Sequence, residues 1–165
     1  MSETQEVEIP LMRLPHAEGL PAPGYASDGA AGADVYAATP EGAPITLAPL
    51  ARAAVPTGLS CAIPPWWEIQ VRPRSGLAAR AGATVINAPG TIDSDYRGEI
   101  KVLLINLGDA PLTIHRGERI AQLVLSPTPR IRWQETTRLP DTERGAGGFG
   151  STGGAAALSA GDQPC

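Results

Sequence analysis

The sequence predicts an all-β protein of many short strands, arranged as a barrel, a sandwich or a jelly roll. Short apolar and β-branched stretches recur along the chain, and turn residues separate nearly all of them. The 165 residues include 19 glycines and 17 prolines. Only one short segment has helical character. Strands interrupted this often leave little room for long helices.

The strands follow from runs of residues that favour extended backbone. Residues 68–72 alternate at period two, which is typical of a half-buried strand, and the continuously apolar 102–105 predicts burial on both faces. A single helical turn is expected at 76–80. The predicted strands are 45–47, 53–59, 67–72, 84–86, 100–106, 112–114, 120–125 and 131–134.

The chain changes character near residue 139. Residues 144–154 are too rich in glycine for a strand, and 155–165 resemble a frayed tail. We therefore expect a β domain over 1–138 and a glycine-rich C-terminal arm over 139–165. The arm is expected to order only on a ligand or a neighbouring subunit.

Composition limits the classes of partner. The formal net charge of −4 disfavours a nucleic acid polymer, because phosphate backbones require a basic face, but a small polyanion needs only a local cluster of cations. No apolar run approaches the roughly 20 residues of a membrane helix. The acidic start lacks the features of a signal peptide, and the two cysteines, Cys61 and Cys165, predict a reducing, cytoplasmic location.

Residues 90–98 (Gly-Thr-Ile-Asp-Ser-Asp-Tyr-Arg-Gly) carry the densest chemistry. Apolar runs on both sides predict a β-hairpin whose tip and return strand are functional. Asp93 or Asp95 can serve as a base there, Tyr96 can stack on a ring, and Arg97 can hold an anion.

The arm formally matches the dinucleotide fingerprint at Gly145, Gly147 and Gly150. That interpretation fails because no strand precedes the glycines and no helix follows them, and a P-loop would need a lysine. Backbone N–H groups with Arg144, Ser151 and Thr152 can still bind phosphate, and Phe149 can cover a base. A flexible tail is the alternative.

Weaker signals come from three other segments. In 73–77, Ser75 either caps the helical turn or joins Arg74 and Gly76 around a phosphate. Asp34, in 31–36, is most simply a solvated loop residue. Gln122, in 116–123, lies among apolar neighbours and needs hydrogen-bond partners if it is buried.

His16 and His115 lack metal-ligand spacing and are expected at the surface, whereas Trp66 and Trp67 are expected to pack in a core or an interface.

Taken in order, segments 31–36, 73–77, 90–98, 116–123 and 144–153 resemble the five motifs of the trimeric dUTP diphosphatases (dUTPases). The resemblance runs from about Gly29 to Gly153. It implies a jelly-roll-like β-barrel of the dUTPase, or β-clip, type and a homotrimer with shared active sites. The implied reaction is Mg²⁺-dependent hydrolysis of dUTP to dUMP and diphosphate, which limits uracil incorporation into DNA and supplies dUMP for dTMP synthesis.

The resemblance also implies a role for each matching residue. Asp93 would activate the attacking water, and Tyr96 would exclude a 2′-hydroxyl. Asp34 and Gln122 would hold the waters of Mg²⁺. Arg97 would brace the hairpin or an interface, and Asp95 would be structural. The remaining matches would bind phosphate (Arg74, Ser75, Gly76), uracil (Asn87, Gly90, Thr91, Ile92, Asp93, Lys101) and, as a lid, the base and outer phosphates (Arg144, Phe149, Gly150, Ser151, Thr152).

Two alternatives share parts of this pattern. A dCTP deaminase has the same fold and would need a glutamate at the pyrimidine ring, for which Glu99 is the nearest candidate. A binding or regulatory module would use the pocket without turnover. The phosphate-clamping arm argues against the first alternative, and the intact Asp93 together with the arm argues against the second.

Overall fold

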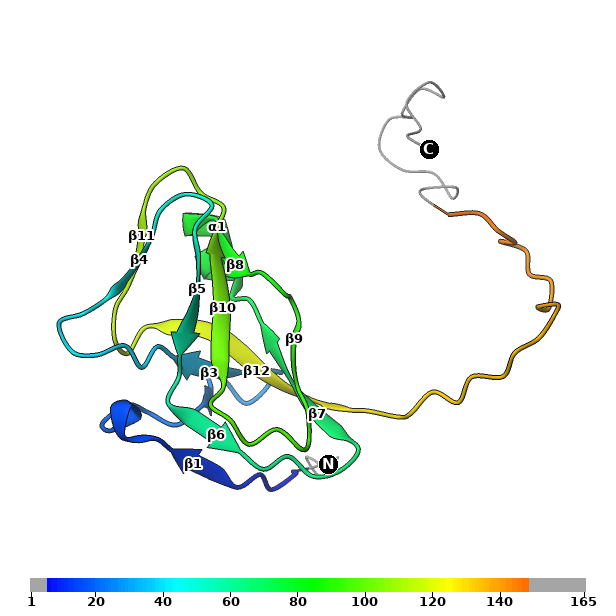
Figure 1. Cartoon of the computed structure of the whole chain (residues 1–165), viewed down its shortest axis with the longest axis horizontal. Coiled ribbons are helices and arrows are strands. Elements are labelled where there is room, and N and C mark those ends of the chain that lie inside the picture. Colours follow the sequence, from blue (N-terminus) through cyan, green and yellow to red (C-terminus); the bar gives the residue numbers. More distant parts are fainter. Residues whose placement is uncertain (1–5, 149–165) are drawn as a thin grey trace. The chain divides into compact units, whose positions relative to one another are not determined.

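The computed structural model describes residues 6–148, which are mostly β with one α-helix (Figure 1). The chain divides into two units, Met1–Pro129 and Arg130–Cys165. No helix in the described part is long and apolar enough to cross a membrane. The elements are β1 (Leu11–Arg13), the 3₁₀ turn η1 (Pro15–Ala17), β2 (Gly24–Tyr25), β3 (Ala33–Tyr36), β4 (Ile45–Leu47), β5 (Arg52–Pro56), β6 (Leu59–Cys61), β7 (Trp67–Arg72), α1 (Ser75–Ala81), β8 (Ala83–Val85), β9 (Gly90–Ile92), β10 (Lys101–Asn106), β11 (Leu112–Ile114) and β12 (Arg119–Pro127).

The strands form four antiparallel sheets. The largest has the order β2-β3-β12-β7-β9, a second has the order β5-β10-β8, and two pairs, β1-β6 and β11-β4, complete the set. Neighbours in these sheets are often far apart in sequence, as in the pairing of β3 with β12. The fold is therefore all-β and jelly-roll-like, as the sequence predicts.

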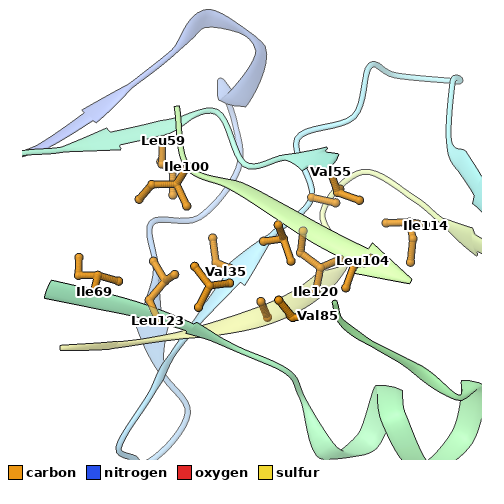
Figure 2. Packing of buried hydrophobic residues seen from close by; sticks show 14 of the residues in the cluster. Val35, Val55, Leu59, Ile69, Val85, Ile100, Leu104, Ile114, Ile120 and Leu123 are labelled. Carbon is orange, nitrogen blue, oxygen red and sulfur yellow. The ribbon is translucent and has the colours of Figure 1, made fainter. Parts of the chain in front are cut away.

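Aliphatic side chains from several strands form the core. Figure 2 shows Val35 of β3, Val55 of β5, Leu104 of β10 and Ile120 of β12 gathered in one cluster. Each of these four is at most 1% exposed. Burial of one such side chain stabilises the fold by roughly 1.5–3 kcal/mol. Aromatic residues make up only 4% of the chain, so aliphatic packing holds the sheets together.

Several expected strands have the predicted bounds. Segments 45–47, 67–72 and 112–114 coincide with β4, β7 and β11, and β7 shows the predicted alternation of burial. The expected helix at 76–80 lies within α1. Trp67 packs against the core as expected, whereas Trp66 is exposed.

Other expectations were wrong. β10 alternates between buried and exposed residues instead of being buried on both faces, and Leu103 is among its exposed ones. Residues 131–134 form no strand, and Trp133 is 83% exposed. The strand expected over residues 53–59 is divided into two, because β5 ends at Pro56 and β6 begins at Leu59. Ser75 is the first residue of α1 and not its N-cap; the N-cap is Arg74, which makes no side-chain capping hydrogen bond.

Candidate active site

Residues 83–106 contain the two paired strands of the expected hairpin, β8 and β10, with an additional strand, β9, between them. β8 and β10 pair antiparallel, with Val85 opposite Leu104. Between them the chain leaves this sheet as β9 and pairs with β7, where Gly90 lies opposite Val71. The segment predicted as a hairpin tip therefore connects the three-stranded and the five-stranded sheets.

A pocket of about 260 Å³ opens beside this connection. Val71, Leu103 and Glu99 line it together with seven residues for which the family resemblance implies a role toward uracil, the sugar or catalysis. These seven are Asn87, Gly90, Thr91, Ile92, Asp93, Tyr96 and Lys101. The structure thus brings these seven residues around one cavity.

Hydrogen bonds within the loop fix its conformation. The Tyr96 N–H donates to the Asp93 carbonyl at 3.1 Å, which closes a turn beside the pocket. The Arg97 guanidinium donates to the Ser94 carbonyl at 2.7 Å and to the Tyr96 carbonyl at 2.8 Å. Arg97 therefore braces the hairpin, which is one of the two roles expected for it. The Tyr96 hydroxyl donates to the Glu99 carbonyl at 2.9 Å.

Glu99 belongs to the pocket, although the sequence singled it out only for the deaminase alternative. Its Oε1 accepts from His16 Nε2 at 2.7 Å and from the Gly58 N–H at 2.8 Å. Burial alone would raise the pKa of Glu99, but these hydrogen bonds and the charges of His16 and Lys101 hold that pKa below its usual value. A carboxylate that two donors hold in place and keep ionised is poorly suited to transfer protons at a pyrimidine ring, the role that the deaminase alternative would require of Glu99.

A second cluster surrounds Asp34, which is 3% exposed. Arg74 Nε donates to Asp34 Oδ1 at 2.9 Å, and Arg119 Nη1 donates to Oδ2 at 2.9 Å. Gln122 Nε2 lies 3.4 Å from Oδ1. Asp34 is thus a buried strand residue, and its simplest interpretation as a solvated loop residue was wrong.

Sheet register explains why these residues meet. Asp34 of β3 lies opposite Gln122 of β12, which lies opposite Arg72 of β7. The next residue back along β7, Val71, lies opposite Gly90 at the pocket. The cluster and the pocket therefore occupy adjacent register positions of one sheet.

Sequence reasoning missed Arg119. Its signal was indirect: a carboxylate buried in a strand requires cations or donors nearby, and Arg119 begins the strand that carries Gln122. Ser75 and Gly76 follow Arg74 at the start of α1. The expected surface position of the histidines is confirmed, yet His16 also binds Glu99.

The arm is described only as far as Gly148. Arg144 Nε donates to the Gly147 carbonyl at 2.8 Å, which closes a local turn. Phe149, Gly150, Ser151 and Thr152 lie outside the described residues.

Comparison with known proteins identifies the family. The dUTPase family profile matches residues 19–153. A mutant dUTPase of Staphylococcus bacteriophage 80alpha with dUpNHpp is 22% identical; its TM-score is 0.78, and the match covers 88% of this chain and 98% of that one.

A second similar structure is a mutant dUTPase from phage phi11 of S. aureus, described with a structural Mg(II) ion. It is 18% identical with a TM-score of 0.70, and the match covers 82% of this chain and 100% of that one. At these identities the structural matches show the fold, while the profile spans most of the chain. The chain belongs to the dUTPase family, and its activity is that of a dUTP diphosphatase.

Proposed function

We propose that the chain hydrolyses the α–β phosphoanhydride of dUTP, with Asp93 activating the attacking water, to give dUMP and diphosphate. The observation that carries the proposal is the convergence of Asn87, Asp93, Tyr96 and Lys101 on one pocket, with the strand Gly90–Ile92 between them. Such a pocket offers a base, an aromatic ring, a cation and an amide to one small ligand.

Uracil is read by the backbone of β9 in this proposal. β9 is the last strand of its sheet, so the backbone groups that face away from β7 have no ladder partner among the strands of residues 6–148. Peptide N–H and C=O groups can pair with the uracil edge much as a complementary base does. A Cβ at Gly90 would come within 3.2 Å of Asn87 Nδ2 and 3.3 Å of Val71 Cβ, so the strand and the Asn87 amide are packed closely at this point.

Asp93 is the proposed general base. Its side chain lines the pocket and lies in an exposed turn directly after β9. A carboxylate there can take the proton of a water as that water attacks the α-phosphorus, a contribution worth roughly 10²–10⁴ in rate. Asp95, two residues on, does not line the pocket among the described residues, in keeping with a structural role.

The phosphates are assigned to the Asp34 cluster. Arg74 and Arg119 together carry two positive charges against the one negative charge of Asp34. The cluster keeps a formal excess of positive charge, which suits a polyanion. Ser75 and Gly76 would add a hydroxyl and a backbone N–H to the site.

Mg²⁺ fits this cluster only through its waters. The described residues contain no group of three or more His, Cys, Asp or Glu side chains that could hold a metal ion directly. Asp34 Oδ1 and Oδ2 and the Gln122 side-chain oxygen are acceptors for metal-bound water, and Mg²⁺ keeps its water readily. When bound to the triphosphate, the ion would offset charge that develops during phosphoryl transfer.

We assign a homotrimer with shared active sites. Arg74 is committed to Asp34 and does not line the pocket, where Lys101 is the lining cation among the described residues. A phosphate site assembled from different protomers would supply the missing cations, and Arg144 with Phe149, Gly150, Ser151 and Thr152 would close it as a lid. Light scattering should give a trimer mass, and a monomer would contradict this assembly.

The decisive test is a nucleotide panel. Diphosphate release is measured with Mg²⁺ from dUTP, dTTP, dCTP and UTP at matched concentrations. We expect turnover of dUTP with little action on the other three. A protein that binds dUTP but releases no diphosphate would instead be a binding module, and ammonia release from dCTP would identify a deaminase.

A further inference from the structure

Glu99 connects the pocket to a turn near the start of the described chain. Its side chain is 15% exposed, and Oε1 accepts from His16 Nε2 at 2.7 Å and from the Gly58 N–H at 2.8 Å. Lys101 Nζ lies 3.7 Å from the other oxygen, Oε2. Two of these three partners, His16 and Gly58, come from outside residues 83–106, so the carboxylate ties this segment to a different part of the fold.

The turn that carries His16 is held firmly. Arg116 donates to the His16 carbonyl at 2.7 Å, to the Glu18 carbonyl at 2.7 Å and to the Thr39 carbonyl at 3.0 Å. The Leu14 N–H donates to the Gly58 carbonyl at 2.8 Å. These bonds hold the two groups that donate to Glu99, the His16 ring and the Gly58 N–H, close together in the absence of a ligand.

Gly58 is required for that placement. Its φ of 63° lies in the left-handed region, and a Cβ there would overlap Ala17, whose side chain is fully buried. A larger residue would push the η1 turn away from β6. The close approach therefore brings the Gly58 N–H and the His16 ring to the same carboxylate oxygen.

The contact continues from Glu99 to Tyr96. The Tyr96 hydroxyl donates to the Glu99 carbonyl at 2.9 Å. The next residue, Ile100, is buried, and its N–H donates to the Leu59 carbonyl at 2.8 Å. The carbonyl that holds Tyr96 is thus anchored through the Glu99 side chain on one side and Ile100 on the other.

We propose that Glu99, held by His16, is a positioning residue that fixes the Tyr96 ring and so sets the preference for dUTP over UTP. The proposal rests on the sugar-facing role assigned to Tyr96 under the proposed function. Tyr96 is 44% exposed, so packing alone does not hold the ring in place. A Tyr96 ring that can move would admit a 2′-hydroxyl more easily. The positions of Asp93 and of the Asp34 cluster would not change.

The test compares His16→Leu, His16→Gln and Glu99→Gln with the wild type. The measured quantity is the ratio of kcat/KM for dUTP to that for UTP. His16→Leu removes the donor, and the ratio should fall about tenfold, which corresponds to about 1.4 kcal/mol, because the Glu99 carboxylate loses a charge-assisted hydrogen bond. Glu99→Gln keeps an acceptor without the charge and should lower the ratio about fivefold. His16→Gln restores an N–H donor and should return the ratio to within about twofold of wild type.

Glu68→Gln is the matched control. The Glu68 carboxylate accepts a hydrogen bond of 2.7 Å from the Gln70 side chain, and Glu68 is not one of the residues that line the pocket. It should leave the ratio unchanged.

A Tyr96→Ala variant separates the sugar role of Tyr96 from the positioning role of Glu99. If its ratio equals that of wild type, the sugar role of Tyr96 is wrong and the positioning role falls with it. If Tyr96→Ala lowers the ratio but His16→Leu and Glu99→Gln do not, the positioning role alone is wrong.

Discussion

Asp34 and Gln122 lie directly opposite each other on β3 and β12, and Gln122 Nε2 lies 3.4 Å from Asp34 Oδ1. The same carboxylate accepts from Arg74 and Arg119. One buried acid on β3, an inner strand of the sheet that carries the pocket, thus orients two arginines and an amide. Removal of its charge should disturb all three.

Asp34→Asn should therefore lower both stability and activity. The loss of charge leaves two arginines facing a neutral amide, at a cost of about 2 kcal/mol, a value below that of a fully buried pair because Arg119 is half-exposed. Urea unfolding gives the stability difference. Turnover of dUTP should also need a higher Mg²⁺ concentration, because an acceptor for metal-bound water is lost.

Asp141→Asn is the matched control for this substitution. Asp141 also pairs with an arginine, Arg138, at 3.0 Å, but the two side chains are 89% and 81% exposed. Exposed pairs contribute little to stability. An equal loss of stability in the Asp34 and Asp141 variants would show that burial of the Asp34 cluster has no energetic consequence.

Asp93→Asn should retain dUTP binding and lose turnover by a factor of about 10²–10⁴, because the amide cannot accept the proton of the attacking water. Binding is measured by calorimetry with a non-hydrolysable analogue, and turnover by diphosphate release. Asp95→Asn, in the same exposed loop, should keep at least half of the wild-type rate. A wild-type rate in Asp93→Asn would remove Asp93 as the base.

Local patterns in the sequence were sufficient for much of the fold. Apolar alternation and turn residues gave β4, β7 and β11 their bounds, because these signals are local. β3 was not predicted as a strand. Its small residues and single aspartate look like a loop until β12 pairs with it and supplies Arg119 and Gln122 as partners of Asp34. Long-range pairing of this kind leaves no trace in a short window.

The site shows the same division. The hairpin residues were predicted as a group because they are contiguous and carry a family motif, and the structure brings them together. The Arg119–Asp34 and His16–Glu99 pairs were missed, because the two residues of each pair are 85 and 83 positions apart in sequence, respectively. The apolar run 102–105 gave the wrong burial because Leu103 lines the pocket instead of packing in the core.

Deletion of residues 144–165 should abolish most turnover and leave the β unit folded, because the strands and α1 all lie within Met1–Pro129. Circular dichroism and thermal unfolding test the folding, and diphosphate release tests the lid. Deletion of 155–165 alone is the control, and it should have little effect because it spares Arg144, Phe149, Gly150, Ser151 and Thr152. Full activity in the longer deletion would exclude a lid.

Gly98→Ala should impair sugar discrimination. A Cβ at position 98 would overlap the hydroxyl end of Tyr96, so the ring must move off the Glu99 carbonyl. We expect a KM for dUTP raised about fivefold and a smaller preference over UTP, because the lost hydrogen bond is worth about 1 kcal/mol. Gly29→Ala is the control, since a Cβ at Gly29 meets no atom within 4 Å. Equal kinetics in the two variants would show that the Tyr96 position does not matter.

The acid stability of the fold should depend on Glu99. Burial raises the pKa of this carboxyl, yet the hydrogen bonds from His16 and Gly58 and the charges of His16 and Lys101 leave it below its usual value. A lowered pKa means that Glu99 stabilises the fold fully above the unfolded-state pKa of about 4.3, and that this contribution disappears as the pH falls through the folded-state pKa. Thermal unfolding of wild type and Glu99→Gln should therefore differ most near about pH 6, and the difference should shrink toward about pH 3. A difference that grows on acidification would mean that the carboxyl is stabilised in its protonated form, which the donors His16 and Gly58 oppose.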